Sequence, residues 1–265
     1  MSSLDDTLAL MRDLRARCEW DAEQSHESLR PYLIEEAHEL DDAIRLRDDP
    51  LMREELGDVL LQVLFHSVMA EERNAFSFSD VAEGLIAKMK GRHPHLYTDA
   101  PREKWEKMKE KMKVAKRTSL AEGLPASLPS LHRAHRLQDR AAGVGFDWPD
   151  VNGPSEKVEE ELAEVRGELV KTPPSYNAAG AAILDERHDA LEEELGDLLF
   201  AVVNLCRKAG VHASLALDKA NAKFERRFAK MEEIAKERGL DFPNLGLEKL
   251  DQLWDDAKRA EVSKS

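Results

Sequence analysis

Apolar residues recur along this chain at intervals of three and four positions, which is the spacing of one face of a helix. The clearest stripes are Leu33, Ala37, Leu40 and Ile44; Val158, Leu162, Val165 and Leu169; and Leu191, Leu195, Leu198, Leu199, Val202 and Cys206. The alternation of apolar and polar residues that indicates strands does not persist over any useful length. The pattern therefore predicts an all-α fold.

Helices are predicted over residues 3–17, 25–47, 50–73, 78–92, 101–117, 127–143, 153–171, 183–209, 212–238 and 246–261. Two clusters of Gly and Pro interrupt this pattern, because these residues break helical periodicity. The cluster Gly123-Leu124-Pro125 and the following Leu128-Pro129-Ser130 predict a linker over residues 119–130. A second cluster around Pro173 and Pro174 predicts a surface loop at about 171–185.

Short motifs occur twice in the same order, which indicates two copies of one helical unit. Residues 35–39 and 160–164 both have the pattern Glu-Glu-x-x-Glu, and residues 54–58 and 193–197 both read Glu-Glu-Leu-Gly-Asp. Further on, residues 87–92 resemble 222–227, and residues 105–109 resemble 254–258. We predict a tandem repeat of two helical-bundle units, with an N-terminal domain at 1–118, a linker at 119–130 and a C-terminal domain at 131–265.

Composition and charge narrow the function. Charged residues make up 35% of the chain and aromatic residues 6%, which favours helices, and the net charge is −14. An acidic surface disfavours nucleic acid polymers and membranes as partners, although a divalent metal can link carboxylates to nucleotide phosphates. Cys18 and Cys206 lie far apart, and neither a signal peptide nor a membrane span is recognisable. These features predict a cytoplasmic location.

The repeated acidic motifs are the strongest candidates for chemistry. Residues three apart share a helix face, so Glu161 with Glu164, and Glu194 with Asp197, would form a quartet if their helices pack together. Carboxylates brought this close repel one another unless a cation neutralises them, and oxygen ligands suit Mg²⁺ or Mn²⁺. The first repeat offers a second quartet of the same spacing: Glu36, Glu39, Glu55 and Asp58.

A glycine precedes the last acidic residue of each quartet. Gly57 and Gly196 lie within strongly apolar helical segments, where glycine costs about 1 kcal/mol relative to alanine. A small residue at this position predicts a close approach of another helix beside the carboxylates.

The ordered set of motifs resembles the MazG family of nucleoside triphosphate pyrophosphohydrolases, within the all-α NTP pyrophosphatase superfamily. Besides the acidic motifs, the two-domain members of that family are similar in the segments 18–21, 92–95, 144–148 and 223–228. The resemblance covers nearly the whole chain, and the segment around 171–185 is a departure from it. It implies two MazG-like units, NTPs as substrates, and hydrolysis to a nucleoside monophosphate and pyrophosphate.

The resemblance also implies roles for particular residues. Glu161, Glu164, Glu194 and Asp197 would hold Mg²⁺, which would bind phosphate oxygens and activate a water for attack on the α-phosphorus. The catalytic base would be a neighbouring carboxylate such as Glu160 or Glu193, and spacing does not fix which. The expected substrate contacts are Lys109, Lys157, Lys223, Arg227, Trp254 and Lys258, with Trp254 as a stacking face for the base.

Two other classes of protein compete with this interpretation. A di-iron carboxylate protein would use paired Glu-x-x-His motifs, but Ala163 occupies the position that corresponds to His38. A non-enzymatic acidic scaffold would bind divalent ions and protein partners, but it would not need the basic residues expected to contact phosphate. Release of pyrophosphate from NTPs with Mg²⁺ separates the enzyme from the scaffold.

The two halves are not expected to be equivalent. Lys157 lies one helical turn before Glu161, whereas Tyr32 holds the corresponding place before Glu36. We therefore expect the C-terminal repeat to carry most of the hydrolysis and the N-terminal repeat to be structural or regulatory. The wide apolar face of a helical repeat, together with the family resemblance, predicts a homodimer.

Overall fold

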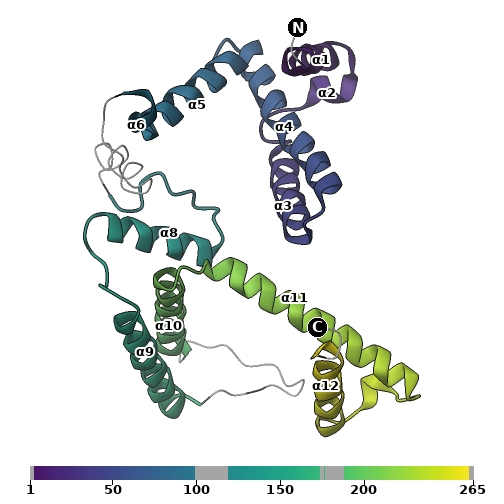
Figure 1. Ribbon diagram of the computed structural model, residues 1–265, viewed down its shortest axis with the longest axis vertical. Coiled ribbons are helices and arrows are strands. Elements are labelled where there is room, and N and C mark those ends of the chain that lie inside the picture. The colour runs from purple at the N-terminus through teal and green to yellow at the C-terminus, as the bar shows by residue number, and fades with distance from the viewer. Residues whose placement is uncertain (1–2, 99–118, 174–175, 177–187, 263–265) are drawn as a thin grey trace. The chain divides into compact units, whose positions relative to one another are not determined.

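The computed structural model describes residues 3–98, 119–173, 176 and 188–262, and the elements within these ranges are helices, apart from an isolated bridge residue at Tyr176. The predicted all-α class is thus confirmed for the described part of the chain (Figure 1). The chain divides into two compact units, Met1–Lys109 and Glu110–Ser265. The predicted domain and linker boundaries remain predictions.

The first unit is built on a pair of long helices. Its elements are α1 (Ser3–Arg17), α2 (Glu19–Glu23), α3 (Arg30–Leu46), α4 (Asp49–Glu72), α5 (Phe78–Arg92) and α6 (Pro94–Tyr97). Helix α4 packs against α1, α3 and α5. The core lies where α1 meets α4, and its buried members are Met11, Leu29, Leu64, Phe65, Val68 and Met69.

Local sequence signals fix several of these helix ends. Asp48 caps α4, because its carboxylate accepts a hydrogen bond of 3.1 Å from the backbone N–H of Leu51. Ser77 and Asp80 form a reciprocal capping box at the start of α5. These side chains satisfy N–H groups that have no partner within the helix.

The second unit contains a helix pair, α9 (Asn152–Lys171) and α10 (Asp189–Lys208), that packs side by side (Figure 1). Helix α8 (Ser130–Gly143) packs against α10 and against α11 (Ala213–Glu237). The chain continues through the short helix η2 (Phe242–Asn244) into α12 (Leu247–Val262), which packs on α11. The core shared by α11 and α12 consists of Met231, Ile234, Ala235, Leu253 and Ala257.

The helix predicted over 25–47 starts later than expected. Residues 25–29 form a turn, because the backbone N–H of Ser25 donates to Ser28 Oγ and the N–H of Ser28 donates to Ser25 Oγ. These local bonds compete with helical ones. The short helix α2 was not predicted. The predicted helix over 101–117, Lys109, and residues 183–187 lie outside the described residues.

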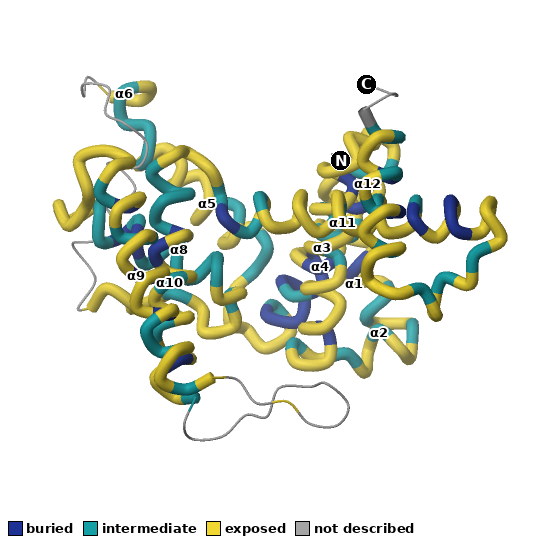
Figure 2. Tube along the Cα trace, turned by 90° about the horizontal axis from the view of Figure 1, so that it is seen from below, coloured by how far each residue is buried: buried dark blue, intermediate teal, exposed yellow. Residues whose placement is uncertain are grey.

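Much of each long helix is exposed (Figure 2), and many of the exposed residues are apolar. On α4 and α10, which carry the repeated Gly-Asp motif, they include Leu56, Leu60, Leu61, Leu195, Leu199 and Val202. No single helix in the described ranges is long and apolar enough to cross a membrane. Taken together, α10 and α11 have sufficient length and apolar composition, but the chain bends by 101° between them.

Candidate metal and nucleotide site

Three carboxylates converge where α9 packs on α10. Oxygen atoms of Glu161, Glu194 and Asp197 lie within 4.8 Å of one another. Glu161 is buried, with 4% of its surface exposed, while Asp197 is exposed. The pKa of Glu164 is raised, first by burial and then by the negative charges of Glu161 and Glu194, so Glu164 lies near both of them. The four residues that the sequence assigned to one quartet are therefore neighbours in the structure.

Lys157 provides a basic partner inside this site. Its Nζ lies 2.5 Å from Oε1 of Glu161 and 3.0 Å from Oε1 of Glu160. Both hydrogen bonds raise the pKa of Lys157, and the bond to Glu161 has the larger effect. The prediction that Lys157 projects along the face of Glu161 is confirmed. The hydrogen bonds therefore favour the charged form of Lys157, which donates to both carboxylates.

The carboxylate set fits a hard divalent cation. Oε2 of Glu161 is buried and has no hydrogen-bond partner among the described residues, although a buried carboxylate oxygen normally has one. Glu194 and Asp197 add negative charge within 4.8 Å of it. A cation that accepts oxygen ligands would satisfy Oε2 and neutralise the cluster.

The first unit repeats this arrangement between α3 and α4. Oxygen atoms of Glu36, Glu55 and Asp58 lie within 4.8 Å of one another. The pKa values of Glu36 and Glu55 are raised, mainly by burial and then by the neighbouring carboxylates, which for Glu55 include Glu39. His38, the residue that suggested a di-iron site, is exposed and outside this group.

Glu160 and Glu193, the candidate bases, are exposed and outside the three-carboxylate group. Glu160 is held by Lys157, while Glu193 lies beside Glu194 in sequence. The structure therefore links Glu160 to the cluster through Lys157, shows no such contact for Glu193 among the described residues, and leaves the catalytic role of both a prediction.

The other predicted substrate contacts gather on α11 and α12. Arg227 lies 5.6 Å from the ring centroid of Trp254, and its Nε donates to Glu261 at 2.8 Å. The ring of Trp254 is 5.3 Å from that of Phe224. Lys223 is exposed on α11, and Lys258 pairs with Asp255 at 2.9 Å.

A cavity adjoins the carboxylates, and none of these four residues lines it. Within the described part of this chain, the structure thus brings Lys157 to the carboxylates but does not bring Lys223, Arg227, Trp254 or Lys258 there.

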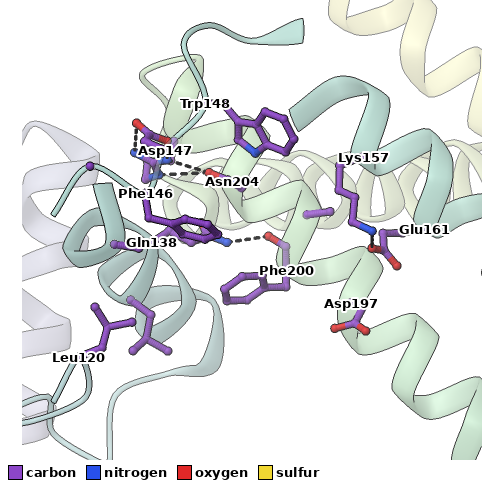
Figure 3. A pocket seen from close by; sticks show the side chains of 15 residues that line it. Leu120, Gln138, Phe146, Asp147, Trp148, Lys157, Glu161, Asp197, Phe200 and Asn204 are labelled. Carbon is purple, nitrogen blue, oxygen red and sulfur yellow. Dashed lines mark hydrogen bonds and ion pairs between the residues drawn. The ribbon is translucent and has the colours of Figure 1, made fainter. Parts of the chain in front are cut away.

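A cavity of about 760 Å³ adjoins the carboxylates, with Lys157, Glu161 and Asp197 in its wall (Figure 3). The remaining wall comes from Leu120, which precedes α8, from α8 and α10, and from the loop between α8 and α9. It includes Gln138, Phe146, Trp148, Phe200 and Asn204. Sequence reasoning missed the functional potential of these residues. The segment Val144–Trp148 supported the family resemblance, but no role followed from it.

The expected close approach at the repeated glycines is not found. A Cβ atom added at Gly57 or Gly196 would meet nothing within 4 Å in the described structure. This prediction is wrong for the single chain, because both glycines are exposed on their helices.

Comparisons with known proteins agree with the tandem helical fold. The family model of the MazG nucleotide pyrophosphohydrolase domain matches twice, at residues 24–97 and 155–232. The chain is 44% identical to a nucleoside triphosphate pyrophosphohydrolase/pyrophosphatase MazG of Thermotoga maritima, over 96% of this chain and 95% of that protein. It is 40% identical to a nucleoside triphosphate pyrophosphohydrolase of Escherichia coli K12, over 99% of both.

The chain therefore belongs to the MazG nucleotide pyrophosphohydrolase family. The resemblance seen in the motifs is confirmed, as are the enzyme class and the tandem arrangement of two MazG units. A protein named Uncharacterized protein YabN from Bacillus subtilis is 41% identical over 96% of this chain but only 51% of its own length.

Proposed function

We propose that this chain hydrolyses nucleoside triphosphates to nucleoside monophosphate and pyrophosphate at the carboxylate cluster of its second unit. The observation that carries the proposal is the buried Glu161, which has an unpartnered oxygen, two carboxylate neighbours within 4.8 Å and an adjoining cavity. The curated names of the full-length relatives support the same activity.

Glu161, Glu164, Glu194 and Asp197 would hold Mg²⁺, with Mn²⁺ as a substitute, because the ligands are all carboxylate oxygens. When bound, the metal would supply charge stabilisation and an acidified water. The protein itself contributes position, because α9 and α10 pack against each other and hold the carboxylates close together.

Lys157 has two tasks in this proposal. It neutralises part of the charge of Glu161 and Glu160, and it presents ammonium protons at the wall of the cavity. A phosphate oxygen is a strong acceptor for such a donor. A carboxylate beside the cluster, Glu160 or Glu193, would accept the proton of the attacking water.

The second unit is proposed as the main site of hydrolysis. Both units contain a carboxylate group, but Tyr32 replaces Lys157 before the first one. Without Lys157, the first site has one positive charge fewer to offer substrate phosphates. The first unit would then be structural or regulatory.

A pair of double variants tests this assignment. Glu161→Gln with Glu164→Gln should abolish pyrophosphate release from a mixture of NTPs with Mg²⁺. The matched pair Glu36→Gln with Glu39→Gln should retain most of it. The opposite pattern would reverse the assignment of the two halves, and full activity in both variants would show that the second unit is not the main site of hydrolysis.

The assembly and location are proposed on separate grounds. We propose a homodimer, because apolar side chains of α4 and α10 are exposed beside the two repeated glycines, where a partner helix would have room. In such a dimer, Lys223, Arg227, Trp254, Lys258 and Lys109 remain candidate substrate contacts.

We propose that residues 119–130 form the linker between the two domains. We also propose a cytoplasmic location, which the unpaired Cys18 and Cys206 support. Nucleic acid polymers and membranes are not proposed as partners, because the net charge is −14.

A further inference from the structure

Three histidine rings meet where α11 begins beside α8 (Figure 1). His132 and His135 are three positions apart on α8, so they share a face of that helix. His212 is the N-cap residue of α11 and contacts both: its ring centroid lies 4.9 Å from that of His132 and 4.5 Å from that of His135. This histidine cluster belongs neither to the carboxylate groups nor to the wall of the cavity beside them.

The histidine cluster contains buried polar atoms without a partner. Nδ1 of His135 and Nδ1 of His212 are buried and have no hydrogen-bond partner among the described residues. The side chain of His212 does not cap α11, and Oγ of Ser214, two residues further on, is likewise buried and unpartnered in the described ranges. Because buried polar atoms are normally satisfied, three such atoms around one helix start indicate a place for a ligand.

Asp139 influences which nitrogen of His135 carries the proton. Its Oδ2 lies 3.8 Å from Nε2 of His135, one turn further along α8. A carboxylate on this side of the ring favours the tautomer with the proton on Nε2, which leaves a lone pair on the buried Nδ1. Histidines that bind a metal through one ring nitrogen commonly direct the other toward a carboxylate in the same way.

The histidine cluster favours neutral imidazole rings. Burial is the main cause that lowers the pKa of His132 and of His135, and the neighbouring His212 lowers both pKa values further. The neutral ring is the form of histidine that binds metal ions. The three rings are therefore in the state that metal binding requires.

Two arginines act on these rings, and both are paired with carboxylates. Arg136 donates to Oδ2 of Asp139 at 2.5 Å. Arg207, at the end of α10, binds the carboxylate of Asp147 and donates to Oδ1 of Asn204 at 2.9 Å. Since nearby negative charge offsets each guanidinium, these arginines oppose a cation at the histidines less than unpaired ones would.

Imidazole ligands select a different metal from the one that suits the carboxylates. Nitrogen ligands suit Zn²⁺, Ni²⁺ and Cu²⁺, whereas Mg²⁺ prefers oxygen. Zn–N bonds of about 2.0 to 2.1 Å in tetrahedral geometry separate two ligand nitrogens by about 3.3 Å, which rings 4.5 to 4.9 Å apart can reach. In the described ranges, the groups of three whose ligand atoms lie within 4.8 Å of one another are the carboxylate groups. A cation at the histidines would therefore bring the nitrogens together by rotating a ring about its side-chain torsions.

We propose that His132, His135 and His212 form a nitrogen-ligated Zn²⁺ site, separate from the carboxylate clusters. The three rings provide the protein ligands, and water takes the fourth position. Because α8 packs on both α10 and α11, a metal that joins α8 to the start of α11 stabilises the second unit. The site acts on stability and takes no part in hydrolysis, so this inference is independent of the proposed function.

Titration of the full chain with Zn²⁺ at saturating Mg²⁺ tests the site. Wild type should bind Zn²⁺, and at 100 times the Kd the Tm of the second unit should rise by about 5 to 11 °C above its value with Mg²⁺ alone. His135→Gln and His212→Asn should each weaken Zn²⁺ affinity by at least about 100-fold and abolish the rise. The Tm of each variant in EDTA shows whether it folds.

Two further measurements identify the ligands. Co²⁺ in place of Zn²⁺ should give the visible absorption of a tetrahedral site with nitrogen ligands in wild type, and this absorption should vanish in His212→Asn. Asp139→Asn keeps all three rings and should weaken Zn²⁺ affinity by about 10- to 100-fold, as expected for loss of an outer-shell partner. This variant decides the matter where a histidine variant does not fold.

His26→Gln is the matched control in the first unit. His26 and His66 also form a close pair, but their Nδ1 atoms lie 2.8 Å apart in a hydrogen bond, and Arg73 donates to Nε2 of His26 at 2.7 Å. These nitrogens already have partners, so His26→Gln should leave Zn²⁺ affinity unchanged.

Several results would overturn the zinc site. Wild type that fails to bind Zn²⁺ at saturating Mg²⁺ is one, and wild-type affinity in His135→Gln and His212→Asn, or in Asp139→Asn, is another. Loss of Zn²⁺ binding in His26→Gln would assign the ion to the first unit, and loss in Glu161→Gln with Glu164→Gln would assign it to the carboxylates. Pyrophosphate release is not a readout here, so failure of the zinc site and failure of the proposed function are separate outcomes.

Discussion

Asp197→Asn should abolish metal binding to the second unit without harming its fold. The substitution keeps the shape of the side chain and removes one negative charge from a group whose oxygen atoms lie within 4.8 Å of one another. At that separation and an effective dielectric constant of about 20, two unit charges repel by roughly 3 to 4 kcal/mol. Because Asp197 is exposed, solvent reduces this value, and the gain in stability of the metal-free variant should be about 1 kcal/mol or less.

The metal-dependent part of stability should change in the opposite direction. A ligand that binds only the folded state at 100 times its Kd stabilises it by about 2.7 kcal/mol. For a unit of this size that corresponds to a rise in Tm of about 5 to 11 °C. Wild type should show such a rise in the melting transition of the second unit at saturating Mg²⁺, and Asp197→Asn should not.

Differential scanning calorimetry with and without Mg²⁺ measures both effects, and pyrophosphate release measures the consequence for turnover. Turnover of Asp197→Asn should fall by at least about 100-fold, the upper end of losses seen when only an outer-shell partner is removed. Asp58→Asn is the matched control in the first unit and should leave turnover largely intact. Retention by Asp197→Asn of both the Mg²⁺-dependent rise in Tm and wild-type turnover would refute the reasoning.

Three further predictions concern stability. Burial alone would raise the pKa of Asp147, but Arg207 and Lys208 outweigh burial and lower the pKa. The carboxylate therefore stabilises the fold at pH values above its unfolded pKa of about 4. This contribution is lost as the pH falls through the folded pKa. Asp147→Asn should therefore cost about 1.5 to 3 kcal/mol at pH 7 in chemical denaturation and flatten the loss of stability between about pH 5 and 3; an unchanged pH profile would contradict the role of this ion pair. Leu253→Ala should destabilise the packing of α11 on α12 by about 2 to 5 kcal/mol, because Leu253 is 1% exposed and the change leaves a cavity; an unaltered Tm would show that this contact is dispensable. Gly167→Ala should raise Tm by about 2 to 4 °C, because alanine is the better helix former and its Cβ would meet nothing within 4 Å. A lower Tm would show that another surface packs against this face of α9.

The sequence by itself determined the helical class, the duplication and the carboxylate pairs. Helical spacing is a local property, so Glu161 and Glu164 had to share a face of α9 wherever that helix packed. The repeated order of the motifs then indicated which helix would face it, and the structure brings Glu194 and Asp197 to that face. The ion pair of Lys157 with Glu161 follows from the same spacing of four residues.

Only the tertiary structure decided what surrounds the carboxylates. Gln138 and Asn204 are 66 positions apart in the sequence, and Phe146 lies between them. All three line one cavity because α8 packs on α10. No local period encodes that contact. Likewise, spacing could not tell that Trp254 joins Phe224 and Arg227 on α11 and α12 while Trp148 joins the cavity. Helix periodicity predicts the carboxylate cluster, whereas the rest of the cavity wall depends on how helices distant in sequence pack.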